Sequence, residues 1–270
     1  MPETDGGENF SSGSEQTTRR SILAEQIEEG IGELERPSGG LLLSALSAGL
    51  DVGFGPFLMV TVATLASGVW TEATMSIVLA NLYAVGFIFV VLGRSELFTE
   101  HTTLAVLPVI DGRASLSELG RLWGLVYAGN IVGASLFAGI VVLVAPAYGI
   151  VDPSAFVDIG KKLVGHPPLV MLSAAILAGW LMGLLSWLVA AAQETISRVF
   201  FVWIIATTIG IAHLPHSIAG TVEVLAAVLV DPAMGFATFG EFLVLSTAGN
   251  AIGGSVFVAL LKYGHVVREA

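Results

Sequence analysis

The chain has 270 residues, of which 54% are hydrophobic and 12% are charged, and its mean hydropathy is +0.84. Soluble globular domains carry about 25% charged residues, so this composition indicates a polytopic membrane protein in a lipid bilayer. The net charge of −11 argues against nucleic-acid binding, and the absence of cysteine excludes disulfides and thiolate metal sites.

The chain is expected to divide into four parts. Residues 1–20 are too polar to form a core, which predicts a disordered acidic tail. Residues 21–38 mix isoleucine and leucine with glutamates, which predicts an amphipathic interfacial helix, although a solvated helix fits the pattern equally well. The transmembrane domain then covers residues 39–263, and residues 264–270 form a C-terminal tail.

Six hydrophobic segments predict six transmembrane helices, because a spanning helix needs about 20 apolar residues. Their ranges are residues 41–67, 75–92, 122–144, 169–192, 199–230 and 242–261. The second segment runs into the polar stretch GRSELFTEHTT, and the fifth contains GIAHLPHSIAGT with Pro215 in it. Pro215 removes a backbone donor, so we expect the fifth helix to be broken there. The polar stretch that starts at Gly93 interrupts the second helix in the corresponding place. Polar residues at membrane depth persist where they line a pathway.

An internal repeat relates the two halves of the chain. AGNIVGASLF begins at residue 128, and AGNAIGGSVF begins at residue 248, 120 positions later. AGLDVG at residue 48 and AGWLMG at residue 178 give a second, weaker match. An odd number of spans in each unit forces the two units into opposite orientations. The sequence therefore predicts an all-α fold of two inverted three-helix repeats, each with a broken middle helix, as in many transporters and channels.

The ends of the broken helices need hydrogen-bond partners. We expect the second half-helices to begin near Thr99 and Ser217, whose hydroxyls are suitable N-caps. Asn130 and Asn250 are expected to satisfy free carbonyl groups at the breaks, with direct pore lining as the alternative.

Two charged residues lie near the first break. Glu96 is expected to cap the loop backbone. Arg94 is expected to form an ion pair with Glu96 or Glu223, with attraction of anions as the alternative.

The basic residues predict the orientation. With the N-terminus inside, the inner face holds Arg19, Arg20, Arg36, Arg113, Arg121, Arg198, Lys262 and Arg268, and the outer face holds Lys161 and Lys162. This distribution satisfies the positive-inside rule. We therefore expect a multi-pass protein of the cell (plasma or inner) membrane with both termini cytoplasmic.

Four motifs resemble the formate/nitrite transporter family: SELFTE (95–100), YAGNIVGA (127–134), HSIAG (216–220) and GNAIGG (249–254). Their order and the six-segment layout match the family over roughly residues 25–263. The resemblance implies an aquaporin-like protomer assembled as a homopentamer. Each protomer would have a pore for small monovalent anions such as formate, nitrite, lactate or hydrosulfide, often moved with a proton.

The resemblance also assigns the pore. His216 matches the central pore histidine, and Thr99 matches the loop threonine that contacts it. The apolar residues of the constrictions are Leu97, Phe98, Tyr83, Phe87 and Ile209. Lys162, or its neighbour Lys161, matches the basic residue of the outer vestibule. Because small shifts carry histidine across neutral pH, transport is expected to be pH-dependent or proton-linked through His216.

The chain departs from the family's pattern at three positions. Pro215 stands where the family usually has a glutamate before the pore histidine, and Gly179 replaces an asparagine of the fourth helix. Arg94 follows Gly93 where a small residue is usual. The chain therefore resembles a divergent branch of the family.

An aquaporin-like channel for small neutral solutes is the alternative function. Such a channel also uses inverted three-helix repeats, but its Asn-Pro-Ala motifs are absent from this sequence. An enzyme is not indicated, because the chain contains no H-E-x-x-H, no G-x-S-x-G and no nucleophile beside a base. We expect no cofactor, no metal site and no catalytic residue.

Overall fold

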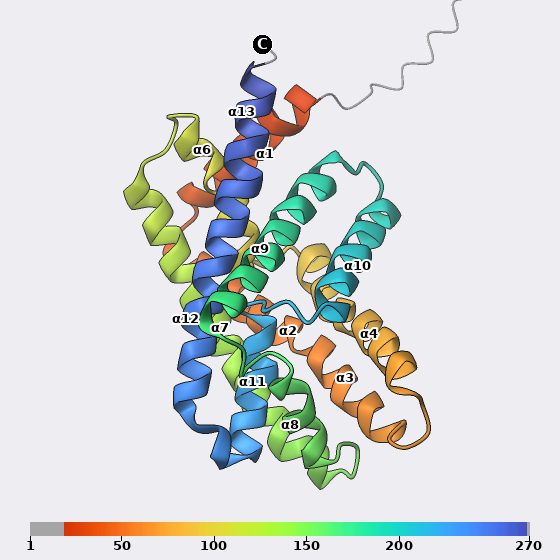
Figure 1. Ribbon diagram of the computed structural model, residues 1–270. Coiled ribbons are helices and arrows are strands. Elements are labelled where there is room, and N and C mark those ends of the chain that lie inside the picture. The colour runs from red at the N-terminus through yellow and green to blue at the C-terminus, as the bar shows by residue number, and fades with distance from the viewer. Residues whose placement is uncertain (1–18, 269–270) are drawn as a thin grey trace, which may run out of the picture.

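The computed structural model describes residues 19–268, and in that range the chain forms helices and no strand (Figure 1). The elements are α1 (Arg19–Glu35), α2 (Ser38–Val52), α3 (Phe54–Leu65), α4 (Glu72–Gly93), α5 (Phe98–Leu104), α6 (Leu107–Ile110), α7 (Leu116–Ala147), α8 (Pro153–Lys161), α9 (Pro168–Ala191), α10 (Thr195–Ile211), α11 (Ala219–Val230), η1 (Pro232–Met234), α12 (Gly235–Ile252), the π-helical η2 (Gly253–Leu260) and α13 (Leu261–Arg268).

The six predicted spans are all helical. Four of them are the helical stretches Ser38–Leu65, Leu116–Ala147, Pro168–Ala191 and Pro232–Arg268, and a fifth is Glu72–Gly93, which continues past its break into α5. The remaining span consists of two shorter apolar helices, α10 and α11, which are separated by a loop. The all-helical fold with its second and fifth spans broken is therefore confirmed.

The predicted N-terminal tail lies almost wholly outside the described residues, whereas most of the predicted C-terminal tail lies within them. Of residues 1–20, only Arg19 and Arg20 are described, and they begin α1. The sixth span continues as α13 to Arg268, so helix covers most of the expected C-terminal tail.

Both breaks contain one residue in the left-handed backbone conformation. Arg94 (φ 53°) ends α4, and His213 (φ 48°) follows the end of α10. A side chain in this conformation costs about 1 to 2 kcal/mol, so the surrounding contacts must hold each break in place.

The half-helices after the breaks begin with apolar caps. The N-cap of α5 is Leu97 and that of α11 is Ile218, and neither side chain accepts a hydrogen bond. The expectation that Thr99 and Ser217 cap these helices is therefore wrong. The Phe98 amide of α5 and the Ser217 amide before α11 obtain their partners from other helices, and the first amide of α11, at Ala219, binds the His216 side chain.

Glycines bring the helices of each unit into close contact. A Cβ added to Gly49 on α2 would lie 2.2 Å from the carbonyl oxygen of Asn130 on α7. A Cβ added to Gly179 on α9 would lie at the same 2.2 Å from the carbonyl oxygen of Asn250 on α12. This identical contact in the two halves supports the predicted repeat, and such close approach is typical of helices packed in lipid.

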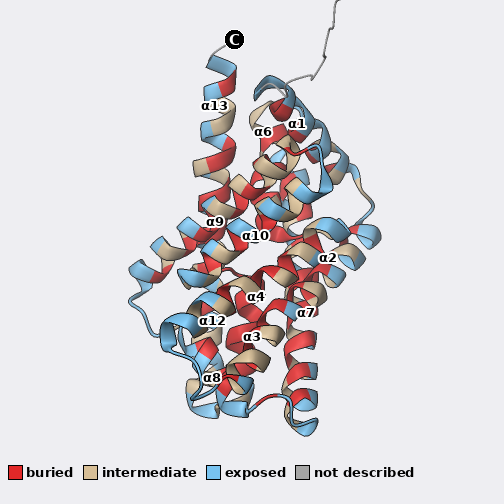
Figure 2. Cartoon of the chain, turned by 90° about the vertical axis from the view of Figure 1, so that its right-hand side faces the viewer, coloured by how far each residue is buried: buried red, intermediate tan, exposed pale blue. Residues whose placement is uncertain are grey.

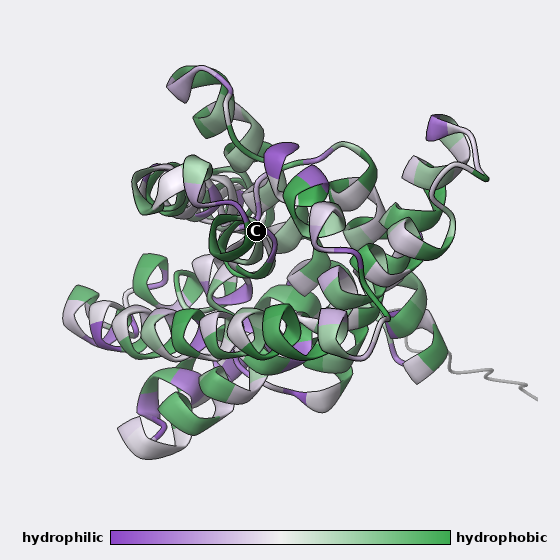
Figure 3. Cartoon of the chain, turned by 90° about the horizontal axis from the view of Figure 1, so that it is seen from below, coloured by the Kyte–Doolittle hydropathy of each residue, from purple (hydrophilic) through white to green (hydrophobic). Residues whose placement is uncertain are grey.

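The buried residues follow the middle of the molecule, while the outside is largely apolar (Figures 2 and 3). Large exposed side chains such as Leu43, Leu143 and Val244 cover the spanning helices. An exterior of this kind suits contact with lipid or with further subunits. The chain is therefore a membrane protein.

Helix α1 packs against the end of the molecule where α6 and α13 also lie (Figure 1). Its residues Ile22, Leu23 and Ile27 join Leu107 and Trp187 in a small apolar cluster. At the opposite end lies α8, which the sequence analysis did not predict. Two short stretches of chain therefore cover the two ends of the six-span bundle.

Candidate functional site

Two asparagines hold the two breaks in equivalent ways. The side chain of Asn130 accepts a hydrogen bond from the Phe98 amide (2.8 Å) and donates to the carbonyl groups of Ala45 and Glu96 (both 2.8 Å). Both asparagine side chains are fully buried. Each bond lies within the first unit, so α7 ties the first break to α2.

Asn250 repeats this arrangement in the second unit. Its side chain accepts a hydrogen bond from the Ser217 amide (2.8 Å) and donates to the carbonyl groups of Ala175 (2.8 Å) and Pro215 (3.0 Å). The two asparagines thus supply hydrogen-bond partners to backbone groups at both breaks.

The two breaks meet at Thr99 and His216. The Thr99 hydroxyl lies 2.8 Å from His216 Nε2, and both residues are 0% exposed. This hydrogen bond joins the inverted units at the centre of the molecule, as the sequence analysis expects for this pair.

The second ring nitrogen of His216 defines the tautomer. His216 Nδ1 accepts a hydrogen bond from the Ala219 amide at 3.1 Å. A neutral imidazole that accepts at Nδ1 carries its hydrogen on Nε2, which therefore donates to the Thr99 oxygen. The Thr99 hydroxyl hydrogen has no acceptor among the described residues, so it can donate to a ligand.

Apolar and aromatic side chains surround this pair. The Phe87 ring meets the His216 ring edge to face, with centroids 5.0 Å apart, and Tyr83 lies 5.1 Å from Phe87. Ile209 belongs to the same buried cluster. The predicted residues Leu97 and Phe98, which precede Thr99 in the chain, are also buried. We call these seven residues (Tyr83, Phe87, Leu97, Phe98, Thr99, Ile209 and His216) the central constriction.

On the α8 side, a small cavity is lined by Lys162, His213 and Glu223, and we call it the α8 vestibule. Its volume is about 10 Å³, room for about one water molecule. Lys162 faces this vestibule, whereas Lys161 lies 3.5 Å from Asp231 in an ion pair. The structure thus separates the two lysines that the sequence left as alternatives.

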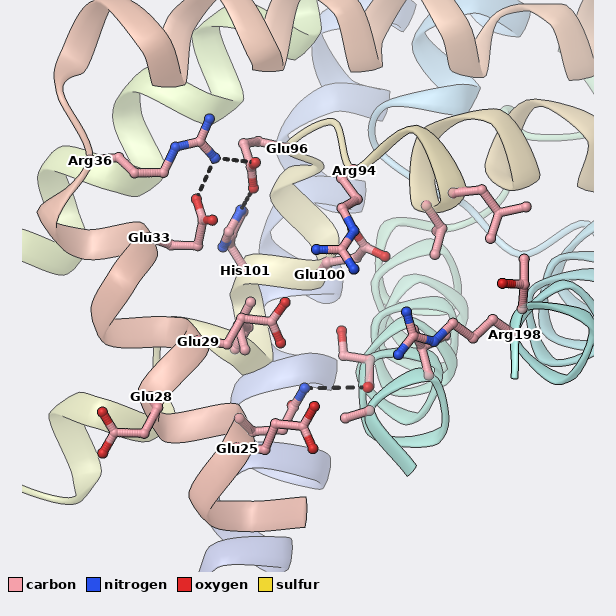
Figure 4. A pocket seen from close by; sticks show the side chains of 18 residues that line it. Glu25, Glu28, Glu29, Glu33, Arg36, Arg94, Glu96, Glu100, His101 and Arg198 are labelled. Carbon is pink, nitrogen blue, oxygen red and sulfur yellow. Dashed lines mark hydrogen bonds and ion pairs between the residues drawn. The ribbon is translucent and has the colours of Figure 1, made fainter. Parts of the chain in front are cut away.

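On the α1 side, a cavity of about 770 Å³ opens, and we call it the α1 vestibule (Figure 4). Arg36 binds both Glu33 and Glu96, and Glu96 also contacts His101 Nε2 at 2.7 Å. Arg94 lines the same cavity. The two vestibules lie on opposite sides of the central constriction.

The surroundings of α1 raise the pKa of two of its glutamates, Glu29 and Glu33. Burial raises the pKa of Glu33, and the charge of Glu96 raises it further, against the opposing effect of Arg36. Burial likewise raises the pKa of Glu29, with added repulsion from Glu33. Docked α1 therefore favours the protonated form of these carboxyl groups.

The ion pair expected for Arg94 does not form. Among the described residues, Glu96 pairs with Arg36 and His101, and Glu223 lies across the constriction in the other vestibule. Glu96 takes part in the break through its backbone carbonyl, which Asn130 binds, rather than as a side-chain cap.

Sequence reasoning missed several residues of the vestibules. Glu33 and Arg36 belong to a segment expected at the membrane interface, and no local pattern signals their contact with the loop at Glu96. The sequence could have revealed α8, because Asp152 caps its first turn and Pro153 occupies its first position.

One group of possible metal ligands occurs within residues 19–268. Ligand atoms of Glu33, Glu96 and His101 lie within 4.8 Å of one another. Arg36 already binds both carboxylates, so a metal ion would have to displace its guanidinium group. This competition disfavours a metal site.

Two inverted three-helix units, each broken in its middle helix, enclose a buried polar pair between two vestibules. This arrangement defines a membrane channel or transporter. The chain belongs to the formate/nitrite transporter family, whose model, described as "Formate/nitrite transporter", matches residues 20–264.

Several known proteins are similar to the chain. Inner membrane protein YfdC of Escherichia coli (strain K12) is 32% identical over 263 residues, which cover 93% of this chain and 80% of the relative. A probable formate transporter of Methanothermobacter thermautotrophicus is 25% identical, over 97% of this chain and 100% of the relative.

Solved structures share the fold. A chain described as an FNT family ion channel superposes with a TM-score of 0.81 at 22% identity, covering 91% of this chain and 99% of its own. A pentameric formate channel with formate bound gives a TM-score of 0.72 at 23% identity, covering 85% of this chain and 98% of its own.

Proposed function

We propose that the protein transports small monovalent weak-acid anions, formate and nitrite among them, through a pore in each protomer. The observation that supports this most directly is the buried hydrogen bond between Thr99 and His216, which joins both breaks between the two vestibules. Membership of the formate/nitrite transporter family and the probable formate transporter among the relatives support the substrate class.

The anion is first concentrated at the α8 vestibule. Lys162 is the basic residue that lines this cavity, and its charge attracts small anions from solution. The constriction beyond it is apolar, so the anion loses water there at a large cost. Losing water favours the neutral acid over the anion.

The Thr99–His216 pair then meets the permeating molecule. The imidazole donates from Nε2 to the Thr99 oxygen, which leaves the hydroxyl hydrogen free to donate to a carboxylate or nitrite oxygen. His216 thus acts through a polarised hydrogen bond while keeping its own proton. Neutralisation of the anion makes transport proton-linked, so flux rises as pH falls.

The distribution of basic residues and the apolar exterior support an orientation in the membrane and an assembly. The α1 and α13 ends lie on one side of the molecule (Figure 1), and most basic residues of the loops belong to that side. By the positive-inside rule, this distribution supports an orientation with both termini in the cytoplasm and the α8 vestibule on the outer side of the cell membrane. The exposed apolar helix faces fit assembly as a homopentamer, the state named for one structural relative.

Flux measurements in proteoliposomes test this function. Thr99→Val removes the hydroxyl with little change in volume, so formate and nitrite flux should fall by about 10-fold to 100-fold, the value of one or two hydrogen bonds in a dry site. Thr208→Val is the matched control, because the Thr208 hydroxyl binds only the Ile204 carbonyl of its own helix.

The same preparation decides between the two candidate functions. Wild-type protein that carries glycerol but neither formate nor nitrite would refute anion transport and favour the channel for neutral solutes. Wild-type anion flux through the Thr99→Val variant would show that the Thr99–His216 pair takes no part in transport.

A further inference from the structure

Glu223 on α11 is the least exposed acidic side chain among the described residues, at 7%. Within residues 19–268 its carboxylate accepts no hydrogen bond and forms no direct ion pair. An ionised carboxylate in such a place is costly, and intramembrane acidic residues commonly serve proton or ion pathways. The proposed function so far gives Glu223 no part.

Glu223 lies between the α8 vestibule and the central constriction. It lies seven residues after His216, on the half-helix that leads away from the break. It lines the α8 vestibule together with Lys162 and His213. Helix α8 packs closely here, since a Cβ on Gly160 would lie 2.8 Å from the Glu223 carbonyl oxygen.

Few ionisable groups face this carboxyl group. The positive charge of Lys162 interacts electrostatically with the Glu223 carboxyl group. Glu223 in turn interacts electrostatically with the hydroxyl group of Tyr83 at the central constriction. His213 faces the same cavity from the broken loop. Helices α3, α7 and α12 bring no titratable side chain to either cavity that Glu223 lines.

His216 is less suited to carry a proton in transit. Both of its ring nitrogens are engaged, because Nδ1 accepts from the Ala219 amide and Nε2 binds Thr99. A second proton on the ring would break the bond to Ala219. Glu223 has no hydrogen bond to lose when it gains or gives up a proton.

We propose that Glu223 holds the proton that neutralises the anion at the α8 vestibule, an inference that rests on the proposed function and extends it. The cavity holds about one water molecule, so it must widen to admit the anion. The O–H bond of the protonated Glu223 carboxyl group breaks, and an O–H bond of the weak acid forms. Glu223 is left as a carboxylate beside Lys162, and the neutral acid enters the central constriction. A proton from solution on the α8 side restores the carboxyl group.

The test uses the full chain in liposomes with a formate gradient. Formate uptake is followed with labelled formate, and proton movement is followed with an internal pH dye. Glu223→Gln keeps the shape but has no proton to give, so formate-driven proton movement should fall by about 100-fold, the usual contribution of a positioned proton donor. Glu223→Asp should keep the coupling. Glu241→Gln is the control, since Glu241 is an exposed glutamate on α12.

The outcomes separate this inference from the function on which it rests. If Glu223→Gln keeps wild-type, pH-dependent proton movement, Glu223 is not the carrier, and anion transport stands. If Glu223→Asp folds, as judged by size-exclusion profile, but loses coupling as completely as Glu223→Gln, a carboxyl group at this position does not sustain the coupling, and the inference is overturned. Wild-type protein that moves no formate or nitrite overturns the proposed function itself.

Discussion

Replacing Asn250 by leucine should destabilise the protein strongly, because three buried hydrogen bonds end on its side chain. The Ser217 amide and the Pro215 carbonyl group would lose the partner that the structure gives them. The Ala175 carbonyl lies inside α9 and keeps its helical bond. Two orphaned buried groups at about 1 to 3 kcal/mol each predict a loss of about 2 to 6 kcal/mol.

The measurement is the free energy of unfolding in bicelles by steric trapping. Asn130→Leu should cost a similar unfolding free energy, because it leaves the Phe98 amide and the Glu96 carbonyl group without their hydrogen-bond partner. Asn81→Leu is the control, because Asn81 is partly exposed and binds only the Ile77 carbonyl and Trp203. Asn81→Leu should lower the free energy of unfolding by about 1 kcal/mol or less. A loss below about 1 kcal/mol for Asn250→Leu would refute the reasoning.

Three further predictions concern helix packing and α1. Gly133→Ala should cost about 1 to 3 kcal/mol of unfolding free energy, because the new Cβ would lie 2.3 Å from the Leu46 carbonyl oxygen. Gly139→Ala, on the same helix with no atom within 4 Å, should cost nothing; equal losses would contradict the packing argument. Arg36→Ala should speed deuterium uptake throughout α1, since Arg36 links α1 to the loop of the first break; unchanged uptake would show that the apolar contacts alone dock α1. The raised pKa of Glu33 means that docked α1 binds more protons than free α1 above the ordinary value of 4.5. Docking should therefore weaken as pH rises from 4.5 through the raised value, seen as faster uptake after correction for intrinsic exchange; slower uptake at the higher pH would contradict this sign.

The fold was largely predictable because its signals are local. Apolar length reveals a spanning helix, and Pro215 within an apolar run reveals a break. The repeated AGN motif even identifies Asn130 and Asn250 as partners of the breaks. Position within the repeat, together with the family resemblance, was enough to bring Thr99 and His216 together.

The caps and ion pairs that could not be predicted depend on contacts between distant segments of the chain, for which the sequence has no local pattern. Thr99 and Ser217 have the side chains of N-caps, yet the caps are Leu97 and Ile218. Asparagines on other helices bind the amides of Phe98 and Ser217, and the His216 side chain binds the first amide of α11, at Ala219. Glu96 takes its partner Arg36 from the bend after α1, 60 residues earlier. Such pairings are decided by tertiary packing, which overrides the local preference of a side chain.

The asparagine contacts also bear on how the protein is made. Every side-chain bond of Asn130 ends on residues 45–98, and every such bond of Asn250 ends on residues 175–217. The first unit leaves the ribosome complete, so its break can be hydrogen-bonded before the second unit is synthesised. No broken helix then has to wait in lipid with unpaired amides. The two units can insert one after the other, and the bond between Thr99 and His216 forms when they meet.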